Sequence, residues 1–196
     1  MAIDVYRGIP EEEINARRTT SEGKTYTLNH PDELVVDMRY IGEEKSNANS
    51  QGWEKSRPNY FKEVYENHPE YFSTKNSMLI ESGKSPMVDA TFTEHFPQYK
   101  GYEGETLVHH HIGKDGQAVA VPQSIHKGHG EIHSVENELG ITDNAREFSN
   151  NCKGICEKDA SFIGKKSSEF KNEQKKRNCK CCRPTRKNGH LKRAVA

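Results

Sequence analysis

Residues 105–140 form the stretch of the chain whose pattern allows the fewest local folds. A short apolar strand that begins at Leu107 leads into three consecutive histidines, and the sequence IGKDG follows. Asp-Gly between two apolar runs is a strong short-range signal for a β-hairpin, and QAVAVP alternates as a returning strand does. Pro122 ends that strand, and SIHKGHGEIHSVENELG predicts a helix that Gly128 and Gly130 weaken in its middle. The order strand, turn, strand, helix therefore predicts a ββα unit.

Helical patterns precede this unit. In SRPNYFKEVYENHPEYF, Phe61, Val64 and Tyr65 share one face by their spacing of three and four, and Pro58 and Pro69 mark the two ends. KNSMLIESGKSP predicts a second short helix that ends at a glycine.

The pattern thus predicts an α+β protein in three parts. Residues 1–50 are polar and rich in turn signals, apart from a short β-like run at 34–38. Residues 51–145 contain the helices and the ββα core, and residues 146–196 are a basic tail that contains all the cysteines, expected to be partly disordered or zinc-binding.

The formal net charge of zero hides a strong asymmetry. Residues 164–196 contain twelve Lys or Arg and two acidic residues, so this segment carries about +10 and the rest of the chain about −10. Basic tails commonly bind nucleic acid or an acidic surface, and the alternative is a solvated, partly disordered tail. No apolar run approaches the roughly 20 residues of a membrane span, and residues 1–18 lack a signal-peptide pattern. We therefore expect a protein without a membrane span that is cytoplasmic when made.

The five cysteines lie late in the chain, and their odd number argues against a disulfide framework. The spacings C-x3-C and C-x-C-C supply soft ligands that could bind a structural zinc ion, although they differ from the regular spacing of zinc ribbons. Reduced thiols without a metal are the alternative. The candidate zinc ligands are Cys152, Cys156, Cys179 and Cys182.

Six of the ten histidines lie between residues 109 and 133. Successive side chains of a strand point to opposite faces, so His109 and His111 should share one face while His110 takes the other. On the following helix, His133 shares a face with both His129 and His126. The hairpin brings the helix back beside the first strand, which predicts a site of three or four metal-binding histidines with one further histidine left to act as a base.

The HHH run, the short glycine-containing turn, AVP-x3-H and the final GEIH resemble the HNH/endonuclease VII superfamily of ββα-metal nucleases, and most closely its bacterial polymorphic-toxin branches. The upstream sequences GWEKSRPNYF, ESGKSPMVD and HFPQYKGYEGETL resemble the lead-in of such toxin domains. The resemblance extends from about Trp53 to Ile141. It implies a small ββα-metal core with flanking helices and the metal-dependent hydrolysis of phosphodiester bonds.

Carried over by position, the resemblance makes His109 a metal ligand and His110 the general base, with His126 and His133 as further ligands. The third consecutive histidine leaves the register open, because the pair of ligand and base could instead be His110 and His111.

The helix leaves a second choice open, since His129 and His133 have the i, i+4 spacing of ligand pairs in colicin-type nucleases. Glu105 and Glu131 are near enough in sequence to orient a histidine, although ordinary surface charge is the simpler interpretation.

The resulting hypothesis is a metal-dependent endonuclease that cuts DNA, with RNA as the other candidate substrate. One divalent ion (Mg²⁺, Zn²⁺ or Ni²⁺) would assist the reaction, and the basic tail would anchor phosphates. As a toxin it would be delivered or secreted, and an immunity protein would neutralise it inside its producer. The competing hypothesis is a non-enzymatic module, stabilised by zinc, that binds nucleic acid or protein.

Overall fold

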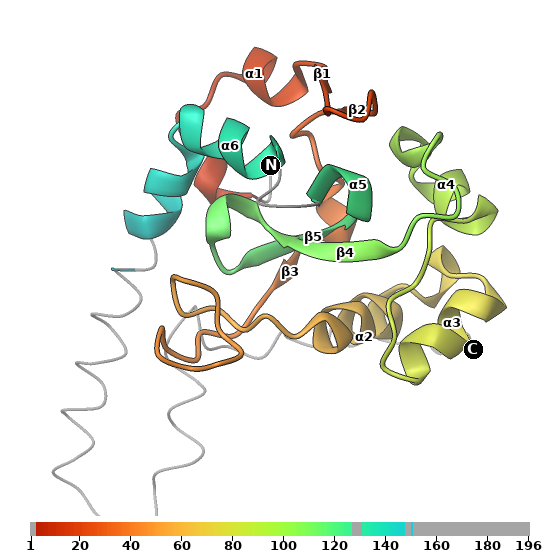
Figure 1. Ribbon diagram of the computed structural model, residues 1–196. Helices are drawn as coiled ribbons and strands as arrows, with labels where there is room; N and C mark the ends of the chain where they lie inside the picture. The colour runs from red at the N-terminus through yellow and green to blue at the C-terminus, as the bar shows by residue number, and fades with distance from the viewer. Residues whose placement is uncertain (1–2, 127–130, 148–149, 151–196) are drawn as a thin grey trace, which may run out of the picture. The chain divides into compact units, whose positions relative to one another are not determined.

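The computed structural model describes residues 3–126, 131–147 and 150, and residues 1–151 form one compact unit. Helices and small antiparallel sheets alternate along the chain, so the predicted α+β class is confirmed (Figure 1). The helices are α1 (Glu11–Asn15), α2 (Arg57–Asn67), α3 (Thr74–Glu81), α4 (Ala90–His95), α5 (Gln123–His126) and α6 (Glu131–Glu138). The strands are β1 (Arg18–Thr19), β2 (Thr25–Tyr26), β3 (Val36–Asp37), β4 (Leu107–His111) and β5 (Gln117–Pro122). The five cysteines lie outside the described residues.

The expected hairpin is formed by β4 and β5, which pair antiparallel with His110 opposite Val119. The short run near residue 36 becomes β3, which pairs with the other edge of β5 and gives the strand order β3-β5-β4. Every residue of the central strand β5 is buried, which explains its nearly continuous apolar sequence. Where one helix was predicted after the hairpin, the structure describes two, α5 and α6, and residues 127–130 between them, which hold the two glycines, lie outside the described residues. Together with α5 and α6, the hairpin forms the predicted ββα core.

The hairpin turn differs in detail from the predicted Asp-Gly turn. A short 3-10 turn spans Ile112–Lys114, and the left-handed residues are Gly113 and Lys114, with φ of 59° and 64°. The Asp-Gly pair lies after this turn, where β5 begins. Gly116 is required there for another reason, because a Cβ atom would stand 2.7 Å from the Trp53 ring.

Both predicted helices before the core are confirmed. Helix α2 begins after Ser56, whose side chain accepts a hydrogen bond from Asn59 N at 3.3 Å, and it buries the face that holds Tyr60, Phe61 and Val64. Helix α3 ends just before Gly83, which has a φ of 73°.

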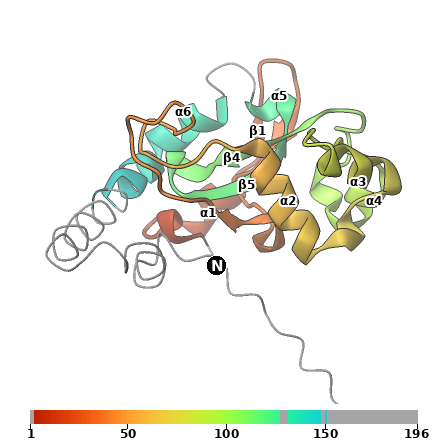
Figure 2. The same ribbon diagram turned by 90° about the horizontal axis from the view of Figure 1, so that it is seen from below.

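The hairpin lies between two layers of helices. In the view of Figure 1, α5 and α6 lie above β4 and β5, and α2 lies below them; Figure 2, seen from below, places α2 in front of the hairpin. Both faces of β4 are therefore covered, and four of its five residues are buried.

The N-terminal segment contributes to the same core. Ile3, Val5, Leu28 and Leu34 pack in one apolar cluster with the hairpin residues, and Tyr60 Oη donates to the Leu34 carbonyl at 2.6 Å. The boundary expected at residue 50 thus falls inside one packed unit. Among the described helices, none is long and apolar enough to cross a membrane.

Candidate metal centre

The three consecutive histidines of β4 divide between the two faces of the strand. The rings of His109 and His111 lie 5.1 Å apart on the side of α2, where His109 stacks on Tyr60 with the ring centres 5.8 Å apart. The ring of His110 lies on the other side, toward the helices α5 and α6. The alternation predicted from strand geometry is therefore present.

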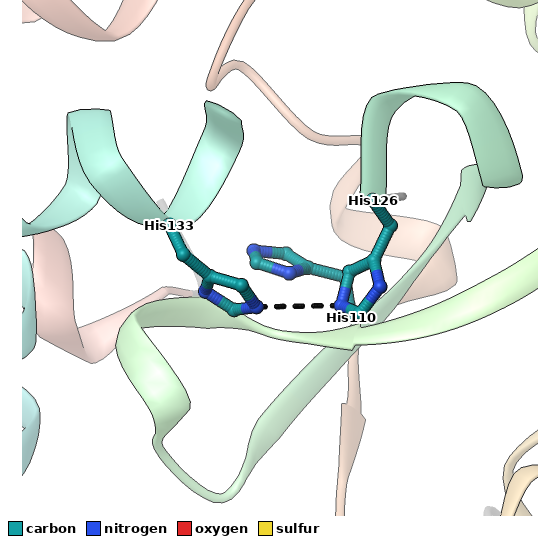
Figure 3. Close-up of side chains that lie close together, drawn as sticks. All are labelled: His110, His126 and His133. Carbon is teal, nitrogen blue, oxygen red and sulfur yellow. Dashed lines mark hydrogen bonds between the residues drawn. The ribbon is translucent and has the colours of Figure 1, made fainter. Parts of the chain in front are cut away.

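On that second side, His110 meets His126 of α5 and His133 of α6. The ring centres of His126 and His133 stand 5.4 Å and 4.6 Å from that of His110. Figure 3 shows the three rings turned toward one another, with a contact of 3.3 Å between the Nε2 atoms of His126 and His133. One ligand nitrogen from each of the three lies within 4.8 Å of the others.

This arrangement fits a divalent metal ion. Zn–N bonds of about 2.0–2.1 Å place two nitrogens of a tetrahedral site about 3.3–3.4 Å apart, which matches the separation of the two Nε2 atoms. In addition, His110 is fully buried and its Nδ1 has no hydrogen-bond partner. A buried polar atom without a partner is uncommon in folded proteins and often marks a binding site.

A buried carboxylate, Glu136, organises the cluster. It is fully buried, and its Oε1 atom contacts Nε2 of His110 at 2.8 Å and accepts a hydrogen bond from the backbone N–H of Gly113 at 2.9 Å. Its Oε2 atom contacts Nδ1 of His133 at 2.9 Å. Burial by itself would raise the pKa of Glu136, but the charge of His110 and the hydrogen bonds from the two histidines outweigh it and hold that pKa below its usual value. The carboxylate is therefore ionised at neutral pH.

Two of the histidines in and beside the centre, His126 and His109, are held in their neutral form. Burial, reinforced by neighbouring positive charge, lowers the pKa of His126 to about 3 and that of His109 to about 3. Among the smaller causes, the charge of Arg57, the first residue of α2, also lowers both pKa values. Neutral imidazole is the form that binds a metal or accepts a proton.

On the other face of β4, a hydrogen bond to the backbone of Asp115 orients His111. Its Nδ1 contacts the Asp115 carbonyl at 2.7 Å and must donate, so Nε2 carries the lone pair; this nitrogen is buried without a partner. Burial lowers the pKa of His111 to about 4. Both ring nitrogens of His109 are also buried without a partner.

Of the predicted site residues, the structure brings together His110, His126 and His133 and leaves His109 on the opposite face. His129, Cys152, Cys156, Cys179 and Cys182 lie outside the described residues, as does the side chain of Glu131. Glu105 accepts a hydrogen bond from Ser124 N at 3.0 Å, in the first turn of α5.

Two residues near the centre were missed by the sequence analysis. Glu136 lies three positions after His133 on the same face of α6, a spacing that could have drawn attention to it. His30 lies 5.9 Å from His110 between ring centres, and its Nε2 is buried without a partner. Burial lowers the pKa of His30 to about 3. No other histidine lies near His30 in sequence at a spacing that could have indicated a site at this position.

The hairpin with α5 and α6 and the three converging histidines agree with what a comparison with known families finds. The chain belongs to the Tox-HNH-HHH family, described as HNH/Endo VII superfamily nuclease toxins with a HHH motif, whose model matches residues 32–134. The resemblance identified from the histidine motifs is confirmed, and the match begins before Trp53, so that it includes β3. The chain matches none of the curated proteins and none of the solved structures with which it was compared.

Proposed function

We propose that this protein is a toxin nuclease that hydrolyses phosphodiester bonds of DNA with one divalent metal ion. The observation that carries the proposal is the convergence of His110, His126 and His133 in a member of a nuclease toxin family. These three side chains would hold the ion, and His129 is the candidate for a fourth ligand. The bound metal would neutralise the negative charge that develops on the phosphate.

The chemistry of the three ligands favours Zn²⁺ or Ni²⁺ over Mg²⁺. Imidazole nitrogen suits borderline transition metals, whereas Mg²⁺ prefers oxygen ligands in octahedral geometry. The one carboxylate of the centre, Glu136, makes its hydrogen bonds to the histidines and the turn.

For the general base we propose His111, with His110 as a metal ligand. This is the second of the two registers that the histidine run allows. It is supported by the position of His110 beside His126 and His133 and by the bond from His111 Nδ1 to the Asp115 carbonyl, which fixes a lone pair on Nε2. The lowered pKa of His111, about 4, keeps the ring ready to accept a proton, and a phosphodiester bound beside it would raise that pKa toward the range of an effective base.

The substrate would be bound largely through its phosphates. Residues 164–196 carry about ten positive charges in excess, and such a segment binds DNA without sequence preference and in a salt-dependent way. A toxin of this kind needs an immunity protein in the cell that makes it, and we expect that partner to present an acidic surface.

Cleavage of supercoiled plasmid by the full-length protein tests the proposal. Cutting should require Zn²⁺, Ni²⁺ or Mg²⁺ and stop with chelator, and a single-stranded RNA assayed in parallel distinguishes the two nucleic acids. If chelator unfolds the protein and no metal restores cutting, the zinc-stabilised binding module replaces the nuclease.

Alanine variants assign the roles. His126→Ala should lose both metal binding and cutting, whereas His111→Ala should keep its metal and lose about 10²–10⁴-fold in rate. His95→Ala is the control, because this exposed histidine lies on α4. Wild-type cutting by His111→Ala would refute the assignment of the base, and loss of metal binding by His109→Ala alone would restore the other register.

A further inference from the structure

One carboxylate contacts two of the three histidines of the centre, and it meets a different ring nitrogen in each of them. Glu136 contacts Nε2 of His110 at 2.8 Å but Nδ1 of His133 at 2.9 Å. A neutral imidazole has only one N–H, and the nitrogen that donates it cannot bind a metal. An ionised carboxylate only accepts hydrogen bonds, so each contact decides which nitrogen of that ring is protonated.

We propose that Glu136 is a positioning residue that selects opposite tautomers in the two histidines, so that Nδ1 of His110 and Nε2 of His133 are the metal-binding atoms. This inference rests on the proposed function, since it concerns the ion of that same site. Both remaining nitrogens fit the assignment: Nδ1 of His110 is buried without a partner, and Nε2 of His133 contacts Nε2 of His126.

The negative charge of Glu136 also matters for the binding of a cation. Three neutral imidazoles bring no charge to a divalent ion, and a buried charge without compensation is costly. A fully buried carboxylate next to two of the ligands supplies that compensation and makes both rings better donors to the metal.

The same oxygen that binds His110 accepts the N–H of Gly113, so the carboxylate also ties α6 to the turn after β4. Gly113 is tightly packed there, because a Cβ atom would stand 2.9 Å from the side chain of Ile141. Glu136 thus fixes both the orientation of the ligand rings and the position of the strand end that carries them.

The first measurement uses the wild-type protein without metal. Long-range ¹H–¹⁵N spectra of the imidazole rings report which nitrogen carries the proton. We expect N–H at Nε2 of His110 and at Nδ1 of His133. The opposite tautomer at either ring would overturn the inference, whether or not any variant folds.

The second measurement uses Glu136→Gln, which keeps the size of the side chain and removes its charge. The amide oxygen can still accept from His110 and Gly113, but the amide N–H₂ then faces Nδ1 of His133 and drives its proton to Nε2, the atom that the metal needs. We expect the affinity for Zn²⁺ and Ni²⁺ to fall about 10–100-fold by calorimetry, with circular dichroism unchanged. The matched control is Glu138→Gln, an exposed glutamate on the same helix, which should bind as the wild type does.

Calorimetry is done on the full chain with its five cysteines alkylated, so that thiolates do not compete for the metal. If the wild type binds the ion and Glu136→Gln binds it with an affinity within twofold of the wild type, the positioning role is refuted and the metal centre stands. If the wild type binds neither ion, the metal centre itself is refuted, and with it this role of Glu136.

Discussion

Acid should destabilise the metal-free protein well above the pH at which its carboxylates titrate. Four buried or partly buried histidines, His30, His109, His111 and His126, have folded-state pKa values of about 3 to 4, which burial lowers from 6.5. Between these limits the unfolded chain binds more protons than the folded one, so the stability that is fully present above about pH 6.5 is lost as the pH falls. Each histidine should cost about 1.4 kcal/mol between pH 7.5 and 5.5, and the four together about 5 kcal/mol. That sum is comparable to the whole stability of a small domain, about 5–15 kcal/mol.

Urea unfolding of the chelated protein at the two pH values measures this loss, followed by the fluorescence of the single, buried Trp53. Glu136 does not obscure the window, because its pKa is lowered from 4.5 and its contribution is lost only at still lower pH. His30→Gln should reduce the loss by about a quarter, whereas His95→Gln, which removes an exposed histidine, should not change it. Equal free energies of unfolding at pH 7.5 and 5.5, within about 1 kcal/mol, would refute the neutral burial of these rings.

Three further substitutions test other parts of the structure. Arg57→Ala should weaken binding of DNA several-fold and reduce the slope of log affinity against log salt by about 1, measured by fluorescence anisotropy, because it removes an exposed positive charge that acts on both His109 and His126. Phe92→Ala should cost about 3–5 kcal/mol in the free energy of unfolding, since this fully buried ring packs against Phe96 with ring centres 4.9 Å apart. Gly116→Ala should lower the melting temperature, at a cost of about 1–3 kcal/mol, because the new methyl group would collide with the Trp53 ring. No loss of stability in the last variant would show that the hairpin and Trp53 can move apart.

Local patterns were enough to predict the ββα core and the helices before it. The hairpin of β4 and β5 and the amphipathic α2 between its two prolines depend on neighbours in sequence, and both are found as predicted. The alternation of side chains between the two faces of a strand also predicted that His110 lies on the face opposite to His109 and His111.

The partners of those side chains depend on contacts between distant segments, which local patterns do not contain. His30 reaches the centre from a segment that the sequence presents as polar and rich in turns, and in sequence only the spacing of three from His133 distinguishes Glu136 from its exposed neighbour Glu138. The turn after β4 was predicted in place but not in type, since Gly116 serves the packing of Trp53 rather than a tight two-residue turn.

Because β4 is covered on both faces, its three histidines are largely shielded from water. A hairpin with one face in water could keep alternate histidines solvated, but here α2 covers one face and α5 and α6 cover the other. Four ring nitrogens of His109, His110 and His111 are consequently buried without a hydrogen-bond partner, at a cost in folding free energy for each. Under the proposed function, a metal ion or a substrate that engages those nitrogens would offset this cost. Binding at this strand should therefore stabilise the fold as well as enable the reaction, since a ligand that binds only the folded state raises its stability.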